Sequence, residues 1–575
     1  MAKPLNYRPA TASHRPLRPV PKGRQVDAKA RATVSEQLEG APRGREWLIE
    51  HLHTLQDAFG CLTTPHLAAL AAEMNLAFAE VFEVATFYAH FFVVEADATP
   101  PVLPIVRVCD GLSCELAGAC GLHGDLVAHL GDRATVVKAP CMGRCDVAPV
   151  VEVGHRHLDN ATVETVTFAV EAGETAPVIP PYQDFDAYVA SGGYELLKAC
   201  RRGSYEPQAF AALLDTAGLR GLGGAGFPTH RKWSFVRQGV AKAGPGPCYV
   251  AINADEGEPG TFKDRHHLER EPHRVLEGTL ISAWGVGAET VYIYLRDEYP
   301  AVHHIFSREI PRLTQAGLAP PGGIHLRRGA GAYICGEETA MLESLEGKRG
   351  LPRHKPPYAA EVGLFGRPTL IHNVETVYWI REIIDKGPEA FAARGKPGHR
   401  GVRSYSVSGR VKQPGVKVAP AGTTALELIE HYAGGMLEGH TFKAYLPGGA
   451  SGGILPAAMA DLPLDFGHLE DHGCFVGSHA VVILSDRDNM ADVALNLLRF
   501  FQDESCGQCT PCRAGTAKAV ALMERRPWDG TLLEELCQVM ADASICGLGQ
   551  AAPNPIRSVL SHFAADLATA TPAES

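Results

Sequence analysis

The chain has 575 residues, which is too long for a single hydrophobic core, so we expect several domains. Its 45% hydrophobic and 21% charged residues are ordinary for a globular protein, and its formal net charge of -11 disfavours nucleic acid as the main partner. No apolar run approaches the ~20 residues of a membrane span, and the N-terminus has no apolar h-region of a secretory signal. We therefore expect a cytoplasmic protein without direct membrane insertion.

Cysteine is abundant. Fifteen cysteines in a chain without a secretory signal favour metal or redox ligands over a disulfide framework. Eight of them fall into two compact patterns. The other seven are scattered and are expected to be small buried residues, namely Cys61, Cys120, Cys200, Cys248, Cys335, Cys474 and Cys537.

The N-terminal 100 residues carry no obvious chemistry. Residues 1–43 are rich in proline and basic side chains and predict a disordered tail, with an arm that docks on a neighbouring subunit as the alternative. Beyond residue 43, apolar side chains recur at helical spacing and predict a small helical bundle. Thr64 and Pro65 are expected to cap a helix over 67–74, and a short helix over 77–82 precedes the motif at 84–88.

Two predicted strands each end at a pair of cysteines. The strand at 104–108 leads to Cys109 and Cys114, and the strand at 135–138 leads to Cys141 and Cys145. Two pairs suit a [2Fe-2S] cluster with two thiolates on each iron, although the spacing is not that of plant-type ferredoxins. Zinc remains an alternative on spacing alone.

A second pattern lies near the C-terminus. Cys506, Cys509 and Cys512 have C-x2-C-x2-C spacing, and Cys546 follows at a distance. Three thiolates on one tight loop can hold three corners of a [4Fe-4S] cube, which a fourth ligand from elsewhere completes. Structural zinc sites usually bring two separated pairs instead, so the spacing favours the cube.

Five further blocks predict a nucleotide site. A glycine-dense loop at 218–226 allows backbone N–H groups to approach a phosphate or a flat ring. A strand at 249–253 runs into a group of acidic residues, which are well placed to bind a ligand at a strand's carboxyl end. A strand near 327 turns through glycines into a helix whose N-terminus could accept a phosphate. The segments 348–358 and 371–376 complete the set.

These blocks, in this order, resemble the FMN- and NADH-binding domain of the complex I flavoprotein family. The motif at 84–88 followed by C-x4-C and C-x3-C resembles the small [2Fe-2S] subunit of the same complex, whose cluster domain is thioredoxin-like. The Cys506 region is similar to the C-terminal cluster domain of the flavoprotein. The glycine loop, in contrast, looks more like the NAD-linked formate dehydrogenase branch.

The resemblance implies the site residues. No catalytic acid or base is implied, because hydride moves directly between nicotinamide and flavin. Leu222 and His372 depart from the complex I pattern and put fine details of the flavin contacts in doubt. By resemblance, the FMN phosphate and ribityl chain are surrounded by Gly221, Gly223, Gly224, Ala225 and Lys232. The flavin is contacted by Asn253, Asp255, Glu256, Gly336, Glu337 and Asn373. The nicotinamide nucleotide is held by Phe227, Phe235, Glu258, Tyr333, Glu338, Lys355 and Tyr358.

The expected fold is multidomain, α/β and α+β. It comprises a basic proline-rich tail (1–43), a helical bundle (44–100), a thioredoxin-like [2Fe-2S] domain (101–182) and a Rossmann-like FMN/NADH domain (183–402). A ubiquitin-like β-grasp module of the SLBB type (403–486) and a helical [4Fe-4S] domain (487–575) follow.

The resemblance implies a diaphorase subunit of a cytoplasmic NAD-dependent formate dehydrogenase. A larger partner subunit with a molybdenum or tungsten cofactor and Fe–S clusters would supply the electrons, since no residue here looks like a site for that metal. The same module in an NAD-reducing hydrogenase or in complex I is the first alternative. A zinc-stabilised scaffold that binds nucleotides without electron transfer is the second.

Overall fold

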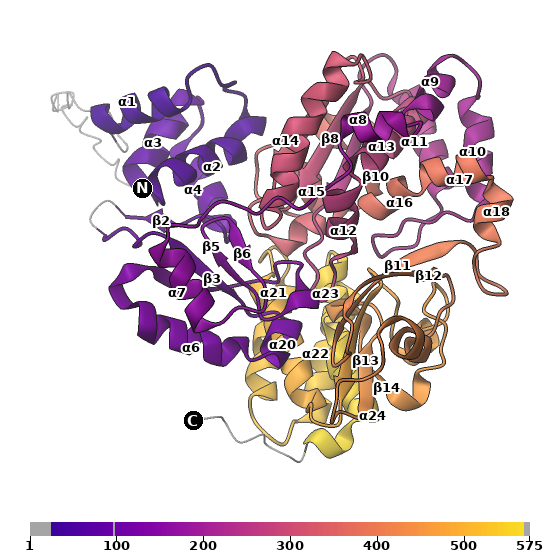
Figure 1. The fold of residues 1–575 in the computed structure, drawn as a ribbon. Coiled ribbons are helices and arrows are strands. Elements are labelled where there is room, and N and C mark those ends of the chain that lie inside the picture. The colour runs from indigo at the N-terminus through magenta and orange to yellow at the C-terminus, as the bar shows by residue number, and fades with distance from the viewer. Residues whose placement is uncertain (1–24, 96–97, 568–575) are drawn as a thin grey trace, which may run out of the picture.

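The computed structural model describes residues 25–95 and 98–567 of the chain. The backbone forms helices at both ends of the described chain, with three larger sheets between them (Figure 1). Within the described residues, no helix combines the length and the apolar character that a membrane crossing requires.

The N-terminal part contains the helices α1 (Ala28–Gln37), α2 (Leu48–Phe59), α3 (Thr64–Glu73) and α4 (Phe78–Phe87). The short strands β1 (Leu62–Thr63) and β2 (Val93–Val94) pair in parallel beside them. Helix α4 ends at Phe87, five residues beyond the expected end at 82, and so includes most of the motif at 84–88. The N-cap of α3 is Thr63, one residue before the expected cap; its side chain accepts a hydrogen bond from the backbone N–H of His66 at 3.4 Å.

Helix α1 corrects the prediction of a disordered tail over 1–43, of which residues 1–24 lie outside the described part. Ala30, Val34 and Leu38 recur every four residues and are all buried, and α1 packs against α3. Side chains four residues apart share one face of a helix, so even this polar segment has an apolar stripe to bury.

Segment 105–171 contains a four-stranded sheet in the order β4-β3-β5-β6. Strands β3 and β4 are parallel, whereas β3 with β5 and β5 with β6 are antiparallel. The strands are β3 (Ile105–Cys109), β4 (Thr135–Ala139), β5 (Val151–Val153) and β6 (Arg156–Leu158). The helices are α5 (Leu112–Leu116), α6 (Ala119–Leu130) and α7 (Val163–Glu171), and α6 and α7 pack on the sheet beside each other.

The largest part contains a parallel sheet in the order β10-β7-β8-β9. Its strands are β7 (Tyr249–Ala254), β8 (Thr290–Leu295), β9 (Ile324–Arg328) and β10 (Thr369–Asn373). The helices around this sheet are α8 (Phe185–Ala190), α9 (Glu195–Arg201), α10 (Pro207–Thr216), α11 (Thr229–Ala243), α12 (Lys263–Arg270), α13 (Pro272–Val286), α14 (Pro300–Gln315), α15 (Glu338–Leu345), α16 (Val374–Tyr378), α17 (Ile380–Lys386) and α18 (Pro388–Ala392).

A mixed sheet follows in the order β12-β11-β15-β13-β14, with β11 and β15 parallel at its centre. Its strands are β11 (Val402–Gly409), β12 (Gly415–Pro420), β13 (Phe442–Leu446), β14 (Leu455–Pro456) and β15 (Ala480–Ser485). The helix expected at 425–433 begins as α19 (Ala425–Glu427) and continues as a π-helical turn over Leu428–Tyr432.

The C-terminal helices are α20 (Met490–Asp503), α21 (Thr510–Met523), α22 (Gly530–Ala543), α23 (Gly547–Ala551) and α24 (Pro553–His562). They lie between segment 105–171 and the mixed sheet (Figure 1); α20 contacts α5, and α24 contacts β14. One apolar core includes Leu52 of α2, Met341 of α15 and Leu497 of α20. The N-terminal and C-terminal helices of the described residues are therefore packed onto the same central part.

Candidate functional site

The parallel sheet ends at a large cavity of about 1190 Å³. The chain runs from β7 through β8 to β9 on one side and then crosses back to β10 on the other side of β7, so the strand order reverses between β7 and β10. Such a switch point opens a crevice at the carboxyl ends of the strands, where ligands of α/β proteins bind. Asn253 and Asn373 are the last paired residues of β7 and β10 and are in register, and both line the cavity.

Every residue that the sequence predicted for FMN and nucleotide contacts lines this one cavity. They are Gly221, Gly223, Gly224, Ala225, Phe227, Lys232, Phe235, Asn253, Asp255, Glu256, Glu258, Tyr333, Gly336, Glu337, Glu338, Lys355, Tyr358 and Asn373. The chain folds segments separated by more than 100 residues into one wall. Their shared position in one cavity is consistent with the predicted roles, which remain predictions for each residue.

The glycine-rich loop precedes α11 and forms one wall. Gly226 has a φ of 62°, and a Cβ there would lie 2.6 Å from the ring of Phe466. A Cβ on Gly223 would lie 3.0 Å from Asn373. Only glycine allows this close approach, so the loop presents its backbone to the cavity.

The two departures from the complex I pattern have different positions. The side chain of Leu222 is fully buried in the apolar core, and its N–H donates to Thr376 Oγ1 at 2.9 Å. It is not among the residues that line the cavity. His372 does line the cavity, and its Nε2 accepts from Trp233 Nε1 at 2.9 Å. Burial lowers the pKa of His372 to about 3, so the ring is neutral.

Of the acidic residues after β7, Glu256 is buried and Asp255 and Glu258 are half-buried, and burial raises the pKa values of all three. The pKa of Asp255 lies well above the usual range, and that of Glu256 rises to about 7. Glu256 accepts hydrogen bonds from the N–H groups of Asp264 and Arg265 at 2.8 and 3.0 Å. Asp255 Oδ2, in contrast, is buried without a hydrogen-bond partner among the described residues. A polar ligand such as a ribityl chain can supply the missing partner.

The lysines of the cavity are paired with glutamates. Lys355 Nζ lies 2.9 Å from carboxylate oxygens of both Glu337 and Glu338, and Lys232 Nζ lies 3.6 Å from Glu338. Glu337 also accepts from the N–H groups of Thr339 and Ala340 at the start of α15. The prediction that this helix N-terminus accepts a phosphate is therefore wrong, because the chain's own carboxylate occupies it.

Aromatic side chains lie at the mouth of the cavity. Phe235 is 42% exposed and Tyr358 is 57% exposed, which is unusual for large rings. The rings of Phe227 and Phe235 lie 6.0 Å apart, and Arg231 lies over both. Exposed rings beside a cavity can stack on a planar ligand such as adenine.

Some cavity residues were not predicted. Lys263 and Asp264 stand in the acidic block that the sequence singled out, so that block offered a signal. Others come from the C-terminal segments, far from the predicted blocks: Ser451, Phe475, Gly477, Ser478, Gly547, Leu548 and Ala551.

The first cysteine set lies at the carboxyl ends of β3 and β4. These strands are parallel, and Cys109 is paired in register with Ala139, so Cys109 and the Cys141 loop meet at one edge. Cys109, Cys114, Cys141 and Cys145 are all buried, and the sulfurs of Cys141 and Cys145 lie 3.4 Å apart. Hydrogen bonds from Cys109 and Cys145 lower the pKa of Cys141. Two pairs of facing thiols fit a cluster with two ligands on each iron.

The second cysteine set lies where three helices meet. Cys506 follows α20, Cys509 is the N-cap of α21, Cys512 lies in the first turn of α21, and Cys546 is the N-cap of α23. Cys512 is buried and the other three are half-buried. Burial raises the pKa of Cys512 to about 11, with the neighbouring thiols Cys509 and Cys506 adding to the effect. Crowded, partly enclosed thiols at converging helix ends fit a four-cornered cluster.

Both cysteine sets adjoin the cavity. The N–H of Tyr333 donates to Glu504 Oε2 at 2.8 Å, and the residues just after Cys546 line the cavity. On the other side, Arg296 donates to the backbone carbonyl oxygens of Glu256 and Cys141. The flavin site and the Cys506 loop, which are separate stretches of the sequence, are therefore neighbours in space.

Three family models match the chain. They are the Thioredoxin-like [2Fe-2S] ferredoxin over residues 34–173, the Nuo51 FMN-binding domain over 214–382 and the NADH-ubiquinone oxidoreductase-F iron-sulfur binding region over 492–570. Both cysteine sets fall within iron–sulfur families, so the zinc alternatives are not supported. The cofactors are FMN, one [4Fe-4S] and one [2Fe-2S] cluster, with NADH as the substrate.

Relatives extend the similarity. The chain is 42% identical to an NADH-quinone oxidoreductase subunit of Rhizobium meliloti (strain 1021) over 402 residues, covering 68% of this chain and 94% of the relative. It is 40% identical to the corresponding NADH-quinone oxidoreductase subunit of Aquifex aeolicus (strain VF5) over 400 residues, covering 67% of this chain and 90% of the relative.

Among solved structures, a chain of the NAD+-reducing [NiFe]-hydrogenase in its H2-reduced state is similar over 93% of this chain and 95% of its own, with 31% identity and a TM-score of 0.79. The sequence relationship to the two NADH-quinone oxidoreductase subunits is close and covers almost their whole length. The chain therefore belongs to the family of FMN-binding NADH-quinone oxidoreductase subunits, joined here in one polypeptide to a thioredoxin-like [2Fe-2S] ferredoxin domain.

Proposed function

We propose that this chain is the diaphorase subunit of a larger NAD-linked complex and exchanges electrons between NAD(H) and clusters on a partner subunit. The observation that carries this proposal is the shared wall between the cavity and the Cys506 loop, through Tyr333, Glu504 and the residues after Cys546. When bound, FMN supplies the conversion between two-electron hydride transfer and one-electron transfer to iron–sulfur clusters.

The residues of the chain would position the two ligands. We assign the glycine loop and Lys232 to the FMN phosphate and ribityl chain, and Asn253 and Asn373 to the flavin. The exposed rings of Phe235 and Tyr358 would stack on the nucleotide. Lys355 would exchange a contact with Glu337 for one with the nucleotide phosphate.

Burial controls protonation at the flavin end of the cavity. Asp255 carries a proton there, because burial raises its pKa by more than the nearby Arg296 lowers it. His372 and Asp255 are thus both neutral. A ligand can therefore contact these two groups by hydrogen bonds and not by ion pairs, and hydride transfer itself needs no protein acid or base.

The identity of the partner subunit is a more specific question. The glycine loop favours a formate dehydrogenase, with a molybdenum or tungsten subunit as electron source. The match over nearly the full length to a chain of an NAD+-reducing [NiFe]-hydrogenase favours the hydrogenase alternative at least as much. Both assignments share the diaphorase half of the reaction.

The test uses the complex purified from its native host with its partner attached. Molybdenum or tungsten together with formate-dependent NAD+ reduction would establish the formate dehydrogenase assignment. Nickel with hydrogen-dependent reduction would assign the chain to a hydrogenase. A complex that reduces NAD+ with neither donor, but oxidises NADH with a quinone, would place it with complex I.

Two further assignments accompany the proposal, one of a domain fold and one of a cellular location. We propose a ubiquitin-like β-grasp module for residues 403–486, supported by the sheet order β12-β11-β15-β13-β14 with its parallel central pair. We propose a cytoplasmic location, supported by fifteen cysteines that are all free thiols in the structure.

A further inference from the structure

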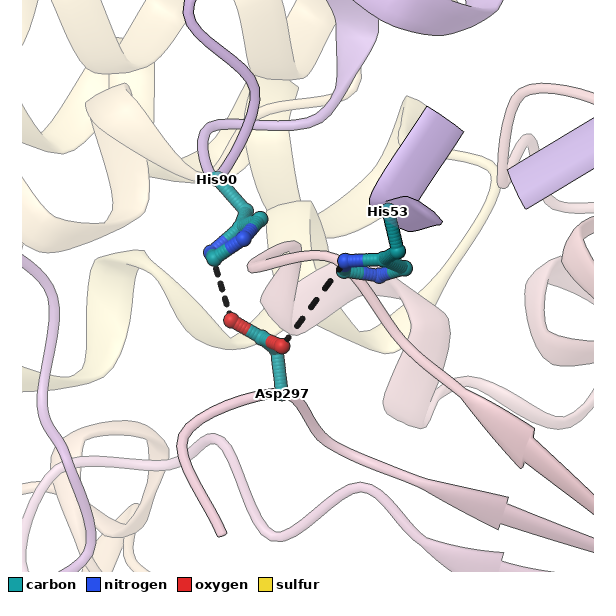
Figure 2. Close-up of side chains that lie close together, drawn as sticks. All are labelled: His53, His90 and Asp297. Carbon is teal, nitrogen blue, oxygen red and sulfur yellow. Dashed lines mark ion pairs between the residues drawn. The ribbon is translucent and has the colours of Figure 1, made fainter. Parts of the chain in front are cut away.

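Two histidines and an aspartate meet in the interior, away from the cavity and both cysteine sets. His53 belongs to α2, His90 follows α4, and Asp297 follows β8. Figure 2 shows both rings directed at the carboxylate. Their ligand atoms all lie within 4.8 Å of one another, and the three side chains are at most 6% exposed. None of the three lines the cavity.

The hydrogen bonding of His53 leaves one ring nitrogen without a partner among the described residues. Its Nε2 lies 2.8 Å from the carbonyl oxygen of Gly329, which can only accept, so Nε2 carries the proton. Nδ1 is then unprotonated and has a free lone pair. It is buried, has no hydrogen-bond partner among the described residues, and lies 4.0 Å from Asp297 Oδ1. Two buried acceptors that face each other are stabilised by a cation between them.

The protonation of the group suits a metal ion. Burial and the nearby Arg328 hold the pKa of His53 well below its usual range, so the ring stays neutral. Arg328 and His90 hold the pKa of Asp297 well below its usual range despite burial, so it is ionised. Neutral imidazole and carboxylate are the forms that coordinate metals.

We propose that His53, His90 and Asp297 form a buried binding site for one divalent transition-metal ion, with zinc as the expected ion. Two imidazoles and one carboxylate bind zinc in proteins and leave the fourth tetrahedral position to a water molecule. The Gly329 carbonyl is the outer partner that fixes the His53 tautomer, as ligating histidines usually have. The ion would connect the N-terminal helices to the flavin-binding sheet.

Binding requires a small rearrangement. Ligands 2.0–2.1 Å from zinc at the tetrahedral angle lie about 3.3 Å apart. The His53–Asp297 distance of 4.0 Å is longer than this and the His90–Asp297 distance of 2.5 Å is shorter. His90 Nδ1 now donates its proton to Asp297 Oδ2. On metal binding that proton would move to His90 Nε2, which is buried without a hydrogen-bond partner among the described residues, so that Nδ1 coordinates as part of a neutral imidazole.

Arg328 is compatible with the ion. Its Nε lies 2.5 Å from Asp297 Oδ1, and its Nη1 lies 2.9 Å from Asp57 Oδ2. Asp57 therefore shares the charge of Arg328. A carboxylate has about four lone-pair positions, so Asp297 can accept from Arg328 and still coordinate a metal ion.

The test measures metals in the intact, cofactor-loaded protein. We expect about one zinc per chain beside the cluster iron. Crystals measured above and below the zinc absorption edge should show an anomalous peak between His53, His90 and Asp297. The variants His53→Gln and His90→Gln should lower the zinc content about tenfold or more, with iron and FMN unchanged.

His51→Gln is the matched control. His51 is a buried histidine of the same helix, but its ring bonds to the carbonyl of Pro42 and it should not affect zinc. The proposal is overturned if the unaltered protein shows no transition-metal peak at this position, which would leave an ion-pair network of Arg328, Asp297 and His90. Zinc retained in both variants would overturn it as well. If the variants lose iron and FMN through misfolding, the map of the unaltered protein decides alone.

Discussion

At the scale of single residues, burial sets the charge state of the cavity wall. Asp255, Glu256 and Glu258 all have raised pKa values, and burial is the largest cause for each. Their hydrogen bonding differs. Glu258 accepts from the N–H of Ser451 at 2.8 Å, whereas Asp255 Oδ2 has no partner among the described residues. Asp255 is therefore the acid best placed to bond a bound ligand.

The first prediction concerns Asp255. Asn has the shape of a protonated Asp, so Asp255→Asn should retain FMN with little loss of affinity. Asp255→Leu removes the polar partner and should cost roughly 1–3 kcal/mol of FMN binding free energy. FMN titration of the flavin-depleted protein, followed by flavin fluorescence, measures both. Equal weakening in the two variants would show that the carboxylate charge is needed.

The second prediction concerns Gly226. Alanine there meets the Phe466 ring as well as the strain of a φ of 62°. Gly226→Ala should lower both the FMN content and the melting temperature. Gly203→Ala is the control, because its φ is 81° but no atom lies within 4 Å of the new Cβ. It should show only the backbone cost of about 1–2 kcal/mol. Matching losses in the two variants would rule out the contact with Phe466 as the cause.

At the scale of elements, strand ends place the reactive groups. The carboxyl ends of β7 and β10 present Asn253 and Asn373, and the ends of β3 and β4 present the cysteine pairs. Parallel neighbours end at the same edge of a sheet, so residues distant in sequence meet there. The N-terminus of helix α15, in contrast, is not open to a ligand, because the Glu337 side chain caps it and excludes an external phosphate.

The third prediction concerns strand β5. Burial raises the pKa of Glu152 from 4.5 to about 7. Between these values the folded protein keeps a proton that the unfolded chain has lost, so this residue's contribution to stability falls as the pH rises from 4.5 to about 7. Glu152→Gln has no such proton. Relative to the unaltered protein, its free energy of unfolding should therefore increase over that window, by at most about 3 kcal/mol.

Melting temperatures at pH 5 and pH 8 test this prediction for Glu152→Gln, Glu152→Asp and the unaltered protein. Glu152→Asp keeps a titrating carboxyl group and is the control. The expected raised pKa would be refuted if the difference between the Gln variant and the unaltered protein were the same at both pH values.

At the scale of the whole molecule, the cavity depends on separate parts of the chain. The glycine loop and sheet supply most of its wall, and the segments 451, 475–478 and 547–551 come from the two C-terminal parts. Arg296 connects the same wall to the loop of Cys141. The nucleotide site and the two cluster sites thus form one assembly, which suits electron transfer over short distances.

The fourth prediction concerns the Cys506 loop. Cys512→Ser should leave most of the NADH–ferricyanide activity but block electron transfer to the partner's clusters, because Cys512 is a predicted cluster ligand and does not line the cavity. Cys537→Ser, at a buried cysteine of α22 in the same part of the chain, is the control and should retain both activities. Equal loss of both activities in Cys512→Ser with FMN still bound would mean that the loop is needed at the flavin itself.

The sequence determined the local features and, through its resemblance, the components of the site. Cysteine spacing and strand patterns depend on neighbours in the chain, so the two cysteine sets and the strands could be predicted from them. The individual cavity residues followed from the resemblance. The apolar stripe of α1, with Ala30, Val34 and Leu38, was missed because a polar composition concealed it.

The tertiary structure alone decided which side chains contact one another. It placed Leu222 in the core and Glu337 on the start of α15. It brought Glu504 to Tyr333, which lies more than 170 residues earlier in the chain. It also brought His53 and His90 to Asp297, from which each is separated by more than 200 residues. Such contacts depend on packing between distant elements. Local periodicity and motif spacing contain no information about them, because the chain between the partners can have almost any length.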